Sequence, residues 1–508
     1  MSRPKTPLAR SLTRARALVA GASALAIAAG LGGALVLDTH PVRAEAVTGS
    51  ASVAAPGFAD LVAQVKPAVV SVRVKSRGGV ATTSGENPFG DQNPFEGTPF
   101  EKFFKKFGQP DGRNGTPKGE GPLVMAQGSG FFVSADGYVV TNNHVVDGAV
   151  KVELVADNGD TYDARVIGTD PKTDLALLKV DGHTDFPYVE LATSKPRIGE
   201  WVLAMGNPFG LGGTVTAGIV SAEGRDIGSG PYDDFIQIDA PVNRGNSGGP
   251  TFNLEGKVIG VNTAIFSPSG GSVGIAFDIP ASTVASVITQ LKEHGRVERA
   301  WLGVQIQPVT KEIASSLDLP EAKGALIAEA QGGGPGAKAG LKSGDVIVRV
   351  DDHAVVDARD LARTIGGYAP NSTVVLGIYR DGQSESVKVA LGRMEDQSTA
   401  KGTGSSEQQG SDQMTLSGLG LSVAPAASVD GAGNEGLMVT GVDGAGAAAD
   451  AGLSTGDVLL KAGGRRLSAG SDLEQALADA KSAGKKSTLV LVRRGNDQLY
   501  VALPANQG

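Results

Sequence analysis

An internal repeat in the C-terminal half restricts the fold more than any other feature of the sequence. AKAGLKSGDVIVRVDDHAV begins at Ala337, and ADAGLSTGDVLLKAGGRRL begins at Ala449. Both stretches contain AGL and then GDV in the same register. An amphipathic segment follows each stretch, at 358–365 and 473–480, and a strand pattern comes next. We therefore predict two copies of one α+β module.

The two predicted modules cover 300–393 and 413–505. Between them, residues 395–412 are dominated by Gln, Ser, Gly and Asp. Such a segment cannot bury a core, so we expect it to be a linker.

The preceding region, 58–292, consists of short apolar runs separated by turn residues. Asp136-Gly137 and Asn158-Gly159 each lie between two apolar runs, a pattern typical of β-hairpins. The regular spacing predicts an all-β barrel or sandwich, closed by a helix over 279–292.

One long insertion, 78–121, interrupts this region and is rich in Gly, Pro, Asn and Phe. A loop of this length is either functional or disordered. Its aromatic side chains either form a local cluster on the barrel or contact another subunit or the substrate. They are Phe89, Phe95, Phe100, Phe103, Phe104 and Phe107.

The N-terminus has the pattern of an export signal. Basic residues precede an apolar stretch from Ala17 to Leu37, and Ala44-Glu45-Ala46 then matches a signal-peptidase site. We predict that residues 1–46 are a signal peptide, removed near Ala46, which places the protein in the periplasm. The alternative is a retained anchor in the inner membrane, since the stretch is long enough to span a bilayer.

Composition excludes several function classes. The net charge of −8 disfavours a nucleic-acid surface. No paired histidines stand at metal-ligand spacing, and no Walker motif is present, so we expect neither a metal nor any other cofactor. Cysteine is absent, so an exported protein of this kind must be held by its cores alone.

The stretch NRGNSGGP holds one serine, Ser247, among glycines. A nucleophilic serine needs a base, and the base needs an orienting partner. Of the five histidines, His144 alone ends a hydrophobic strand within the predicted barrel, so elimination makes it the candidate base.

Several aspartates lie downstream of the candidate base, and spacing does not choose among them. Asp174 is the best candidate, because it opens the apolar strand LALLKV and can be buried at one end. Asp170, before Pro171, is expected to start a turn. The full set is Asp147, Asp157, Asp160, Asp163, Asp170, Asp174 and Asp181.

The glycines around the serine fit the same chemistry. The turn Gly245-Asn246-Ser247 would form an oxyanion hole, with the N–H groups of Gly245 and Ser247 aimed at one point. Glycine at Gly245, Gly248 and Gly249 permits such a turn and leaves space for substrate. The order His, Asp, Ser is that of the chymotrypsin clan.

TNNHVV, TDLALLKV and NRGNSGGP together resemble the HtrA/DegP (protease Do) family of serine endoproteases, over nearly the whole exported chain. The resemblance implies a double β-barrel followed by two PDZ domains, with His144 as general base, Asp174 as its orienting partner and Ser247 as nucleophile. It also implies that the Phe-rich insertion reaches a neighbouring subunit within homotrimers that build larger cages.

Two departures from digestive proteases of the clan are informative. The residue before the serine is Asn246 rather than Asp, so activation by a new N-terminus is not expected, and control falls to loop ordering. The wall NTAIFS carries no acidic residue. By position, Ala264 and Ile265 would line the primary specificity pocket (S1) and select small aliphatic side chains.

PDZ domains bind extended C-termini by strand addition, with backbone amides holding the carboxylate. In this chain the loop Trp301-Leu302-Gly303-Val304 would hold it in the first domain. Gly418-Leu419-Gly420-Leu421 is the less certain equivalent in the second domain, which could instead be a structural module that packs cages.

The sequence thus predicts an ATP-independent endoprotease that degrades unfolded exported proteins and binds peptide C-termini. Two alternatives remain. One is a chaperone-like binding protein, and the other is a membrane-tethered protease with one specific target.

Overall fold

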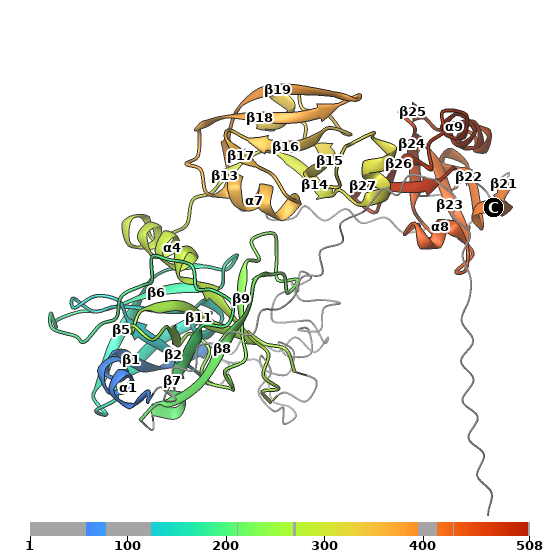
Figure 1. The fold of residues 1–508 in the computed structure, drawn as a ribbon. Helices are drawn as coiled ribbons and strands as arrows, with labels where there is room; N and C mark the ends of the chain where they lie inside the picture. Colours follow the sequence, from blue (N-terminus) through green and yellow to red (C-terminus); the bar gives the residue numbers. More distant parts are fainter. Residues whose placement is uncertain are drawn as a thin grey trace, which may run out of the picture. The chain divides into compact units, whose positions relative to one another are not determined.

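The computed structural model describes residues 57–77, 123–210, 212–267, 271–394, 414–429 and 431–505 (Figure 1). The expected signal peptide, the Phe-rich insertion and the linker lie outside the described residues. Among the described helices, none is both long and apolar enough to cross a membrane.

The first barrel closes through six antiparallel strands in the order β1-β2-β3-β6-β5-β4. Alternate side chains point inward, as Val70, Val72 and Val74 of β1 show by their complete burial. The hairpins expected around Asp136-Gly137 and Asn158-Gly159 join β2 to β3 and β4 to β5. The strands are β1 (Val69–Arg77), β2 (Leu123–Phe132), β3 (Tyr138–Asn142), β4 (Ala149–Val155), β5 (Thr161–Asp170) and β6 (Leu175–Val180).

The second barrel has the same number of strands, in the order β10-β11-β12-β9-β8-β7. Its inner face holds a separate apolar cluster that includes Val202, Ile238 and Ile259. The strands are β7 (Trp201–Gly206), β8 (Thr214–Arg225), β9 (Phe235–Ile238), β10 (Pro250–Phe252), β11 (Val258–Ile265) and β12 (Ala276–Pro280).

A larger apolar cluster joins the two barrels and receives helix α4 (Ala281–His294). The helix begins two residues later than predicted, because Pro280 ends β12 in an extended conformation. Gly295 ends it at φ +71. The remaining helices of this part are α1 (Ala59–Val65), η1 (Lys66–Ala68), α3 (Asn143–Val146) and η2 (Pro208–Gly210).

The first α+β module has a sheet in the order β14-β15-β16-β18-β19 and a separate pair, β13-β20. Helix α7 (Ala358–Gly366) buries Leu361 and Ile365 in the core of this module. The strands are β13 (Ala300–Trp301), β14 (Val304–Pro308), β15 (Ala325–Ala330), β16 (Val346–Val350), β17 (His353–Ala354), β18 (Thr373–Arg380), β19 (Gln383–Ala390) and β20 (Gly392–Arg393). Short helices α5 (Lys311–Ser316) and α6 (Pro335–Lys338) complete it.

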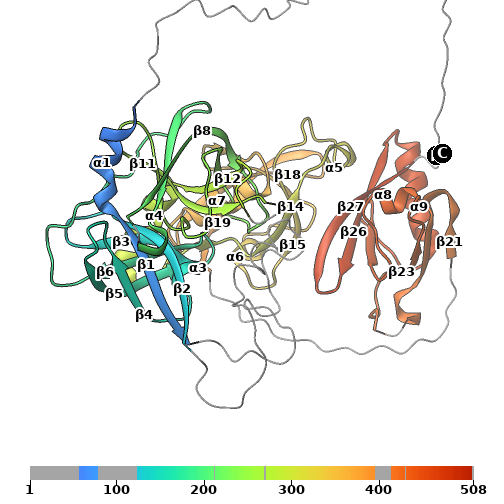
Figure 2. The same ribbon diagram turned by 90° about the horizontal axis from the view of Figure 1, so that it is seen from below.

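The second α+β module orders its sheet β21-β22-β23-β24-β26-β27, and helix α9 (Gly470–Ser482) packs against it (Figure 2). The repeat seen in the sequence is thus confirmed as a repeated fold. The strands are β21 (Met414–Leu416), β22 (Leu421–Pro425), β23 (Leu437–Val442), β24 (Val458–Ala462), β25 (Arg465–Arg466), β26 (Ser487–Arg494) and β27 (Asp497–Pro504). The short helices are η3 (Ser417–Leu419), η4 (Ala426–Ser428) and α8 (Ala447–Asp450).

Candidate active site

His144 lies on the single-turn helix α3, which directly follows β3. The buried side chains of Val145 and Val146 anchor this turn in the first barrel, while the His144 ring stays half-buried. Asn142, just before the turn, has no exposed surface, and its Nδ2 donates to Thr263 Oγ1 of the second barrel at 3.0 Å. The imidazole is therefore held where the two barrels meet.

Asp174 binds the imidazole from the residue before β6. Its Oδ2 lies 2.6 Å from His144 Nδ1, and its Oδ1 accepts the backbone N–H of His144 at 2.9 Å. Its backbone has φ +54, a left-handed conformation that is uncommon for a residue other than glycine. Asn142 Nδ2 and the Asn143 N–H both donate to the Asp174 carbonyl, at 2.9 and 3.0 Å, and hold this conformation.

The pairing changes the acidity of the imidazole. Burial by itself lowers the pKa of His144, but the charge of Asp174 and its hydrogen bond outweigh burial. The pKa of His144 therefore lies above its ordinary value of 6.5.

Asp170 has a different partner and does not reach His144. Arg299 binds it through two bonds of 2.9 and 2.6 Å, and both side chains are buried. Its carbonyl accepts the Thr173 N–H, so the expected turn is present. Of the two leading carboxylates, the structure brings Asp174 to the histidine.

The Ser247 turn comes from the second barrel and packs against the first. Ser247 O accepts the Ser129 N–H at 2.8 Å, and Ser129 Oγ donates to Gly245 O at 2.5 Å. A Cβ on Gly128 would lie 2.7 Å from the Val145 side chain and 3.1 Å from Ser247 O. The serine turn is therefore close to the helical turn that carries His144.

Two backbone N–H groups of this turn have no acceptor among the described residues. The Asn246 N–H is used inside the turn, where it donates to Asn243 O at 3.1 Å. In the described part of the chain, the N–H groups of Gly245 and Ser247 meet no acceptor. Gly245 has φ +90, which favours glycine at this position. Of the three residues expected to form the hole, Asn246 thus contributes no donor.

Asn262 is a supporting residue that sequence reasoning missed. It is fully buried on β11 and holds the two glycines after the serine. Its carbonyl accepts the Gly248 N–H at 2.8 Å, and its own N–H donates to Gly249 O at 2.9 Å. Ser129 was missed as well, although it lies in GSGFF, where a small polar residue interrupts the apolar pattern of a strand. Asn262 carries the same signal, because it interrupts the apolar strand VIGVNTAI.

The two residues expected in the S1 pocket pack in different cores. Ala264 belongs to the cluster between the barrels, whereas Ile265 belongs to the interior of the second barrel. Neighbouring residues of a strand point to opposite faces, so the two cannot line one wall together. We therefore retain only Ala264 as a candidate wall residue.

The expected carboxylate loop of the first module has the backbone that such a site needs. Gly303 has φ +72, and the carbonyls of Leu302 and Gly303 accept the N–H groups of Gly336 and Gln331 at 2.7 and 2.9 Å. Within the described residues, the N–H groups of Leu302 and Gly303 have no acceptor. Trp301 ends β13 and Val304 begins β14, so the loop lies at one end of an edge strand.

The second module has a similar loop. Gly420 has φ +65, Leu419 is buried in η3, and Leu421 begins β22. The edge of β22, unlike that of β14, is paired with β21.

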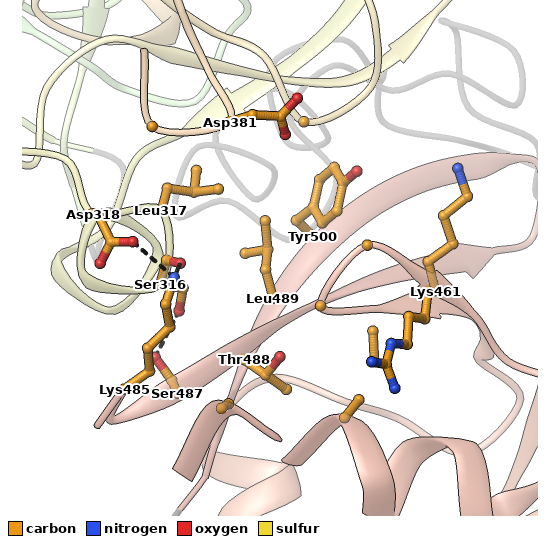
Figure 3. A pocket seen from close by; sticks show the side chains of 18 of the residues that line it. Ser316, Leu317, Asp318, Asp381, Lys461, Lys485, Ser487, Thr488, Leu489 and Tyr500 are labelled. Carbon is orange, nitrogen blue, oxygen red and sulfur yellow. Dashed lines mark hydrogen bonds and ion pairs between the residues drawn. The ribbon is translucent and has the colours of Figure 1, made fainter. Parts of the chain in front are cut away.

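A cavity of about 640 Å³ does not coincide with the His144 cluster. It is lined by the two α+β modules, where Lys485 Nζ binds Asp318 at 2.8 Å and the hydroxyls of Ser316 and Ser487 lie 2.7 Å apart (Figure 3). These groups bind one another, so we assign no chemistry to the cavity. In the described part of the chain, no group of three or more His, Asp or Glu side chains could hold a metal ion.

Comparisons with known proteins agree with this architecture. Residues 128–261 match the trypsin-like peptidase domain, and residues 300–391 and 417–503 each match the PDZ domain. A probable periplasmic serine endoprotease DegP-like protein of Brucella suis biovar 1 (strain 1330) is 48% identical over 510 residues, covering 96% of this chain and 98% of that protein. The chain belongs to the DegP-like family of periplasmic serine endoproteases.

Further DegP-like relatives and solved structures support the family. The DegP-like protein of Rhizobium meliloti (strain 1021) is 45% identical over 509 residues, covering 96% of this chain and 99% of that protein. The HtrA-type protease AlgW, solved with a decapeptide, is 36% identical with a TM-score of 0.54 and covers 67% of this chain and 100% of its own. The predicted family, the mainly β fold with a double barrel and two PDZ domains, and the serine endoprotease activity are confirmed.

Proposed function

We propose that this DegP-like protease cuts unfolded or damaged exported proteins without ATP, using His144, Asp174 and Ser247. The observation that supports this proposal most strongly is the geometry around His144. His144 and Asp174 form a 2.6 Å pair beside a serine turn whose Gly245 and Ser247 N–H groups have no acceptor in the described part of the chain.

In the proposed reaction, Ser247 Oγ attacks the carbonyl carbon of the scissile peptide bond. His144 Nε2 takes the hydroxyl proton, while Asp174 accepts the Nδ1–H and stabilises the imidazolium that forms. The N–H groups of Gly245 and Ser247 bind the oxyanion of the tetrahedral intermediate.

The intermediate collapses when the C–N bond breaks and His144 gives its proton to the leaving amine. An ester between Ser247 and the acyl half of the substrate remains. Water then attacks this ester, with His144 again taking the proton. The bond between Ser247 Oγ and the acyl carbon breaks, His144 returns the proton to Oγ, and the free carboxylic acid leaves. Because His144 must be neutral to act as a base, and its pKa is raised above its ordinary value of 6.5, activity should increase with pH over a range that starts above pH 6.5.

The buried methyl group of Ala264 suits cleavage after small aliphatic residues. No acidic side chain occurs in β11, so we do not expect cuts after Lys or Arg. A product map dominated by such basic residues would exclude this pocket wall.

The first PDZ domain is the proposed receptor for peptide C-termini. Strand β14 is an edge strand, and the two N–H groups of Leu302 and Gly303 at its start can hold a carboxylate. Side chains of the peptide would lie between β14 and α7, against Leu361 and Ile365.

The same helix α7 also touches the protease domain, in the loop between β8 and β9. Arg363 binds Asp234 at 2.7 Å, and Arg359 is paired with Asp226. A peptide bound beside α7 can therefore bias the second barrel, where the serine turn lies, if it binds one state of this contact more tightly than the other. We propose that peptides with free, apolar C-termini activate cleavage in this way.

We further propose a periplasmic location after signal-peptide cleavage near Ala46. The DegP-like relatives are named periplasmic, and a 17–37 apolar segment preceded by basic residues fits export. Assembly as a homotrimer or a larger cage of trimers, and additional chaperone activity, remain proposals that rest on the resemblance alone.

Casein digestion by the purified protein tests the catalytic assignment. The Ser247→Ala variant should fold normally and lose activity by about 10⁴–10⁶-fold. Ser194→Ala, at an exposed serine of the same domain, is the matched control and should keep full activity. If Ser247→Ala still digested casein at a substantial rate, Ser247 would not be the nucleophile.

A further inference from the structure

The two PDZ domains differ at the edge strand on which a peptide would add. In the first domain, β13 turns away and pairs with β20, so β15 is the only described strand that pairs with β14. The contact of β14 with β27 of the second domain runs through side chains, such as that of Gln307. In the second domain, β21 pairs antiparallel with β22, with Met414 opposite Val423 and Leu416 opposite Leu421. The chain itself therefore occupies the strand-addition edge of β22.

The side chains of β21 also alternate as those of a bound peptide do. Leu416 is 3% exposed and packs in the core of the domain. Met414 is partly buried and contacts α9, since a Cβ on Gly470 would lie within 2.3 Å of the Met414 sulfur. Thr415 between them is exposed, and its Oγ1 lies 3.2 Å from Ser422 Oγ. Peptides bound by strand addition likewise insert alternate side chains and use the backbone for affinity.

The segment differs from a free peptide because it has no terminal carboxylate. After Leu416 the chain continues through Ser417 and Gly418 into the loop that would otherwise hold a carboxylate. The segment thus offers two apolar side chains and a strand backbone, but no terminal charge.

We propose that Met414–Leu416 is a built-in ligand of the second PDZ domain, which binds a free peptide of the form apolar-x-apolar only when this segment leaves. The inference deepens the peptide-binding part of the proposed function, on which it rests. The second PDZ domain would bind peptides as the first does, but its binding edge on β22 is covered by β21.

Covalent attachment makes the segment a strong competitor. A tethered ligand has an effective concentration of the order of millimolar, so a free peptide of equal affinity at micromolar concentration is outcompeted about a thousandfold. External peptides should therefore bind the first domain alone while the segment is in place.

Peptide stoichiometry in the full chain tests the proposal, with Ser247→Ala present so that the peptide is not cut. The probe is a fluorescent decapeptide ending in Met-Thr-Leu with a free carboxylate. We expect one bound peptide per chain with the natural segment. We expect two when Met414, Thr415 and Leu416 are all replaced by Gly.

A disulfide lock is the matched control. Thr415 and Ser422 are opposite each other, and the chain has no cysteine, so Thr415→Cys with Ser422→Cys adds the only two thiols. The oxidised protein should bind one peptide. Two peptides bound to the protein with the natural segment, or to the oxidised lock, would contradict the proposal. A folded Gly variant that binds no more peptide than the natural protein would contradict it as well.

If the natural chain bound no peptide and the Gly variant bound one, the first PDZ domain would not be the receptor given under the proposed function, but this inference would stand.

Hydrogen exchange on the unmodified protein gives an answer that needs no folded variant. Protected amides within Met414–Leu416 are expected, and fast exchange of all three would overturn the proposal.

Discussion

The two barrels of the protease domain have the same number of strands, but their polar groups are paired to different degrees. In the first barrel, each Asp174 oxygen has a partner on His144, and Asn142 holds the Asp174 backbone. In the second barrel, Gly245 and Ser247 present N–H groups without an acceptor in the described part of the chain. The first barrel thus holds the imidazole that we propose as the base. The second barrel presents two backbone N–H groups that we propose bind the oxyanion.

The buried carboxyl group of Asp278 is a further unpaired polar group in the second barrel. Asp278 on β12 is fully buried, and neither of its oxygens has a hydrogen-bond partner among the described residues. It lies opposite Asn262, whose Oδ1 accepts the Thr251 hydroxyl at 3.2 Å. Burial raises the pKa of Asp278 to about 7. The Thr251 hydroxyl lies nearby and lowers the pKa only slightly, because it donates to Asn262 instead. The second barrel therefore bears an unfavourable buried charge at alkaline pH, which the first barrel avoids.

The largest expected effect comes from the first barrel, where Asp174 is paired with His144. Asp174→Asn should lower kcat by about 10⁴-fold, because the amide no longer holds the imidazole in the required tautomer. The charge that raises the pKa of His144 is also lost, whereas burial still lowers it, so the acid limb of residual activity should move to lower pH. A pH–rate profile of casein cleavage measures both.

Asp170→Asn separates chemistry from stability in the same experiment. It breaks the buried bond pair with Arg299, so the unfolding temperature should fall while kcat stays within about tenfold. An equal loss of kcat in both variants would show that the acidic partner had been misassigned.

The second-largest effect concerns the stability of the second barrel, where Asp278 is buried. Because the folded pKa of Asp278 is about 7 and the reference value is 3.8, the folded state keeps a proton that the unfolded state releases. The contribution of Asp278 to the free energy of unfolding should fall by about 4 kcal/mol as the pH rises from about 4 to about 7, and it should then stay constant. Unfolding of the Asp278→Asn variant should lack this fall.

The exposed Asp136→Asn change is the control for the loss of one carboxylate. If Asp278→Asn had the same pH dependence as the natural protein, the two barrels would not differ in the way proposed.

The smallest effect concerns the contact between the second barrel and α7. Arg359→Glu with Arg363→Glu should reduce peptide activation by up to about thirtyfold, because the two half-exposed ion pairs contribute about 0–1 kcal/mol each. A reporter cleavage assay with and without a free C-terminal peptide measures this. Arg465→Glu, in the second PDZ domain, should leave activation unchanged.

Much of the fold was predictable because its patterns are local. The Asp-Gly and Asn-Gly turns, the alternating strands and the repeated AGL and GDV marked the barrels and the two modules. Helix α4 was displaced by two residues, because Pro280 belongs to the strand before it.

The site was predictable in part. His144 and Asp174 follow from strand ends and elimination, and the structure brings them together. Asn262 and Ser129 were missed, since their roles arise from contacts between segments far apart in the sequence. Ile265 was misplaced because position along the chain does not show which face of β11 a side chain takes.

The most direct test of the account is covalent labelling of the active serine. A fluorophosphonate reacts with a serine that a neighbouring base has activated, and peptide mapping by mass spectrometry then locates the adduct. We predict one adduct per chain, on Ser247, formed more slowly by at least about 10³-fold in His144→Ala. An adduct on another serine, or equal labelling of Ser247 without His144, would contradict the assignment of the catalytic residues.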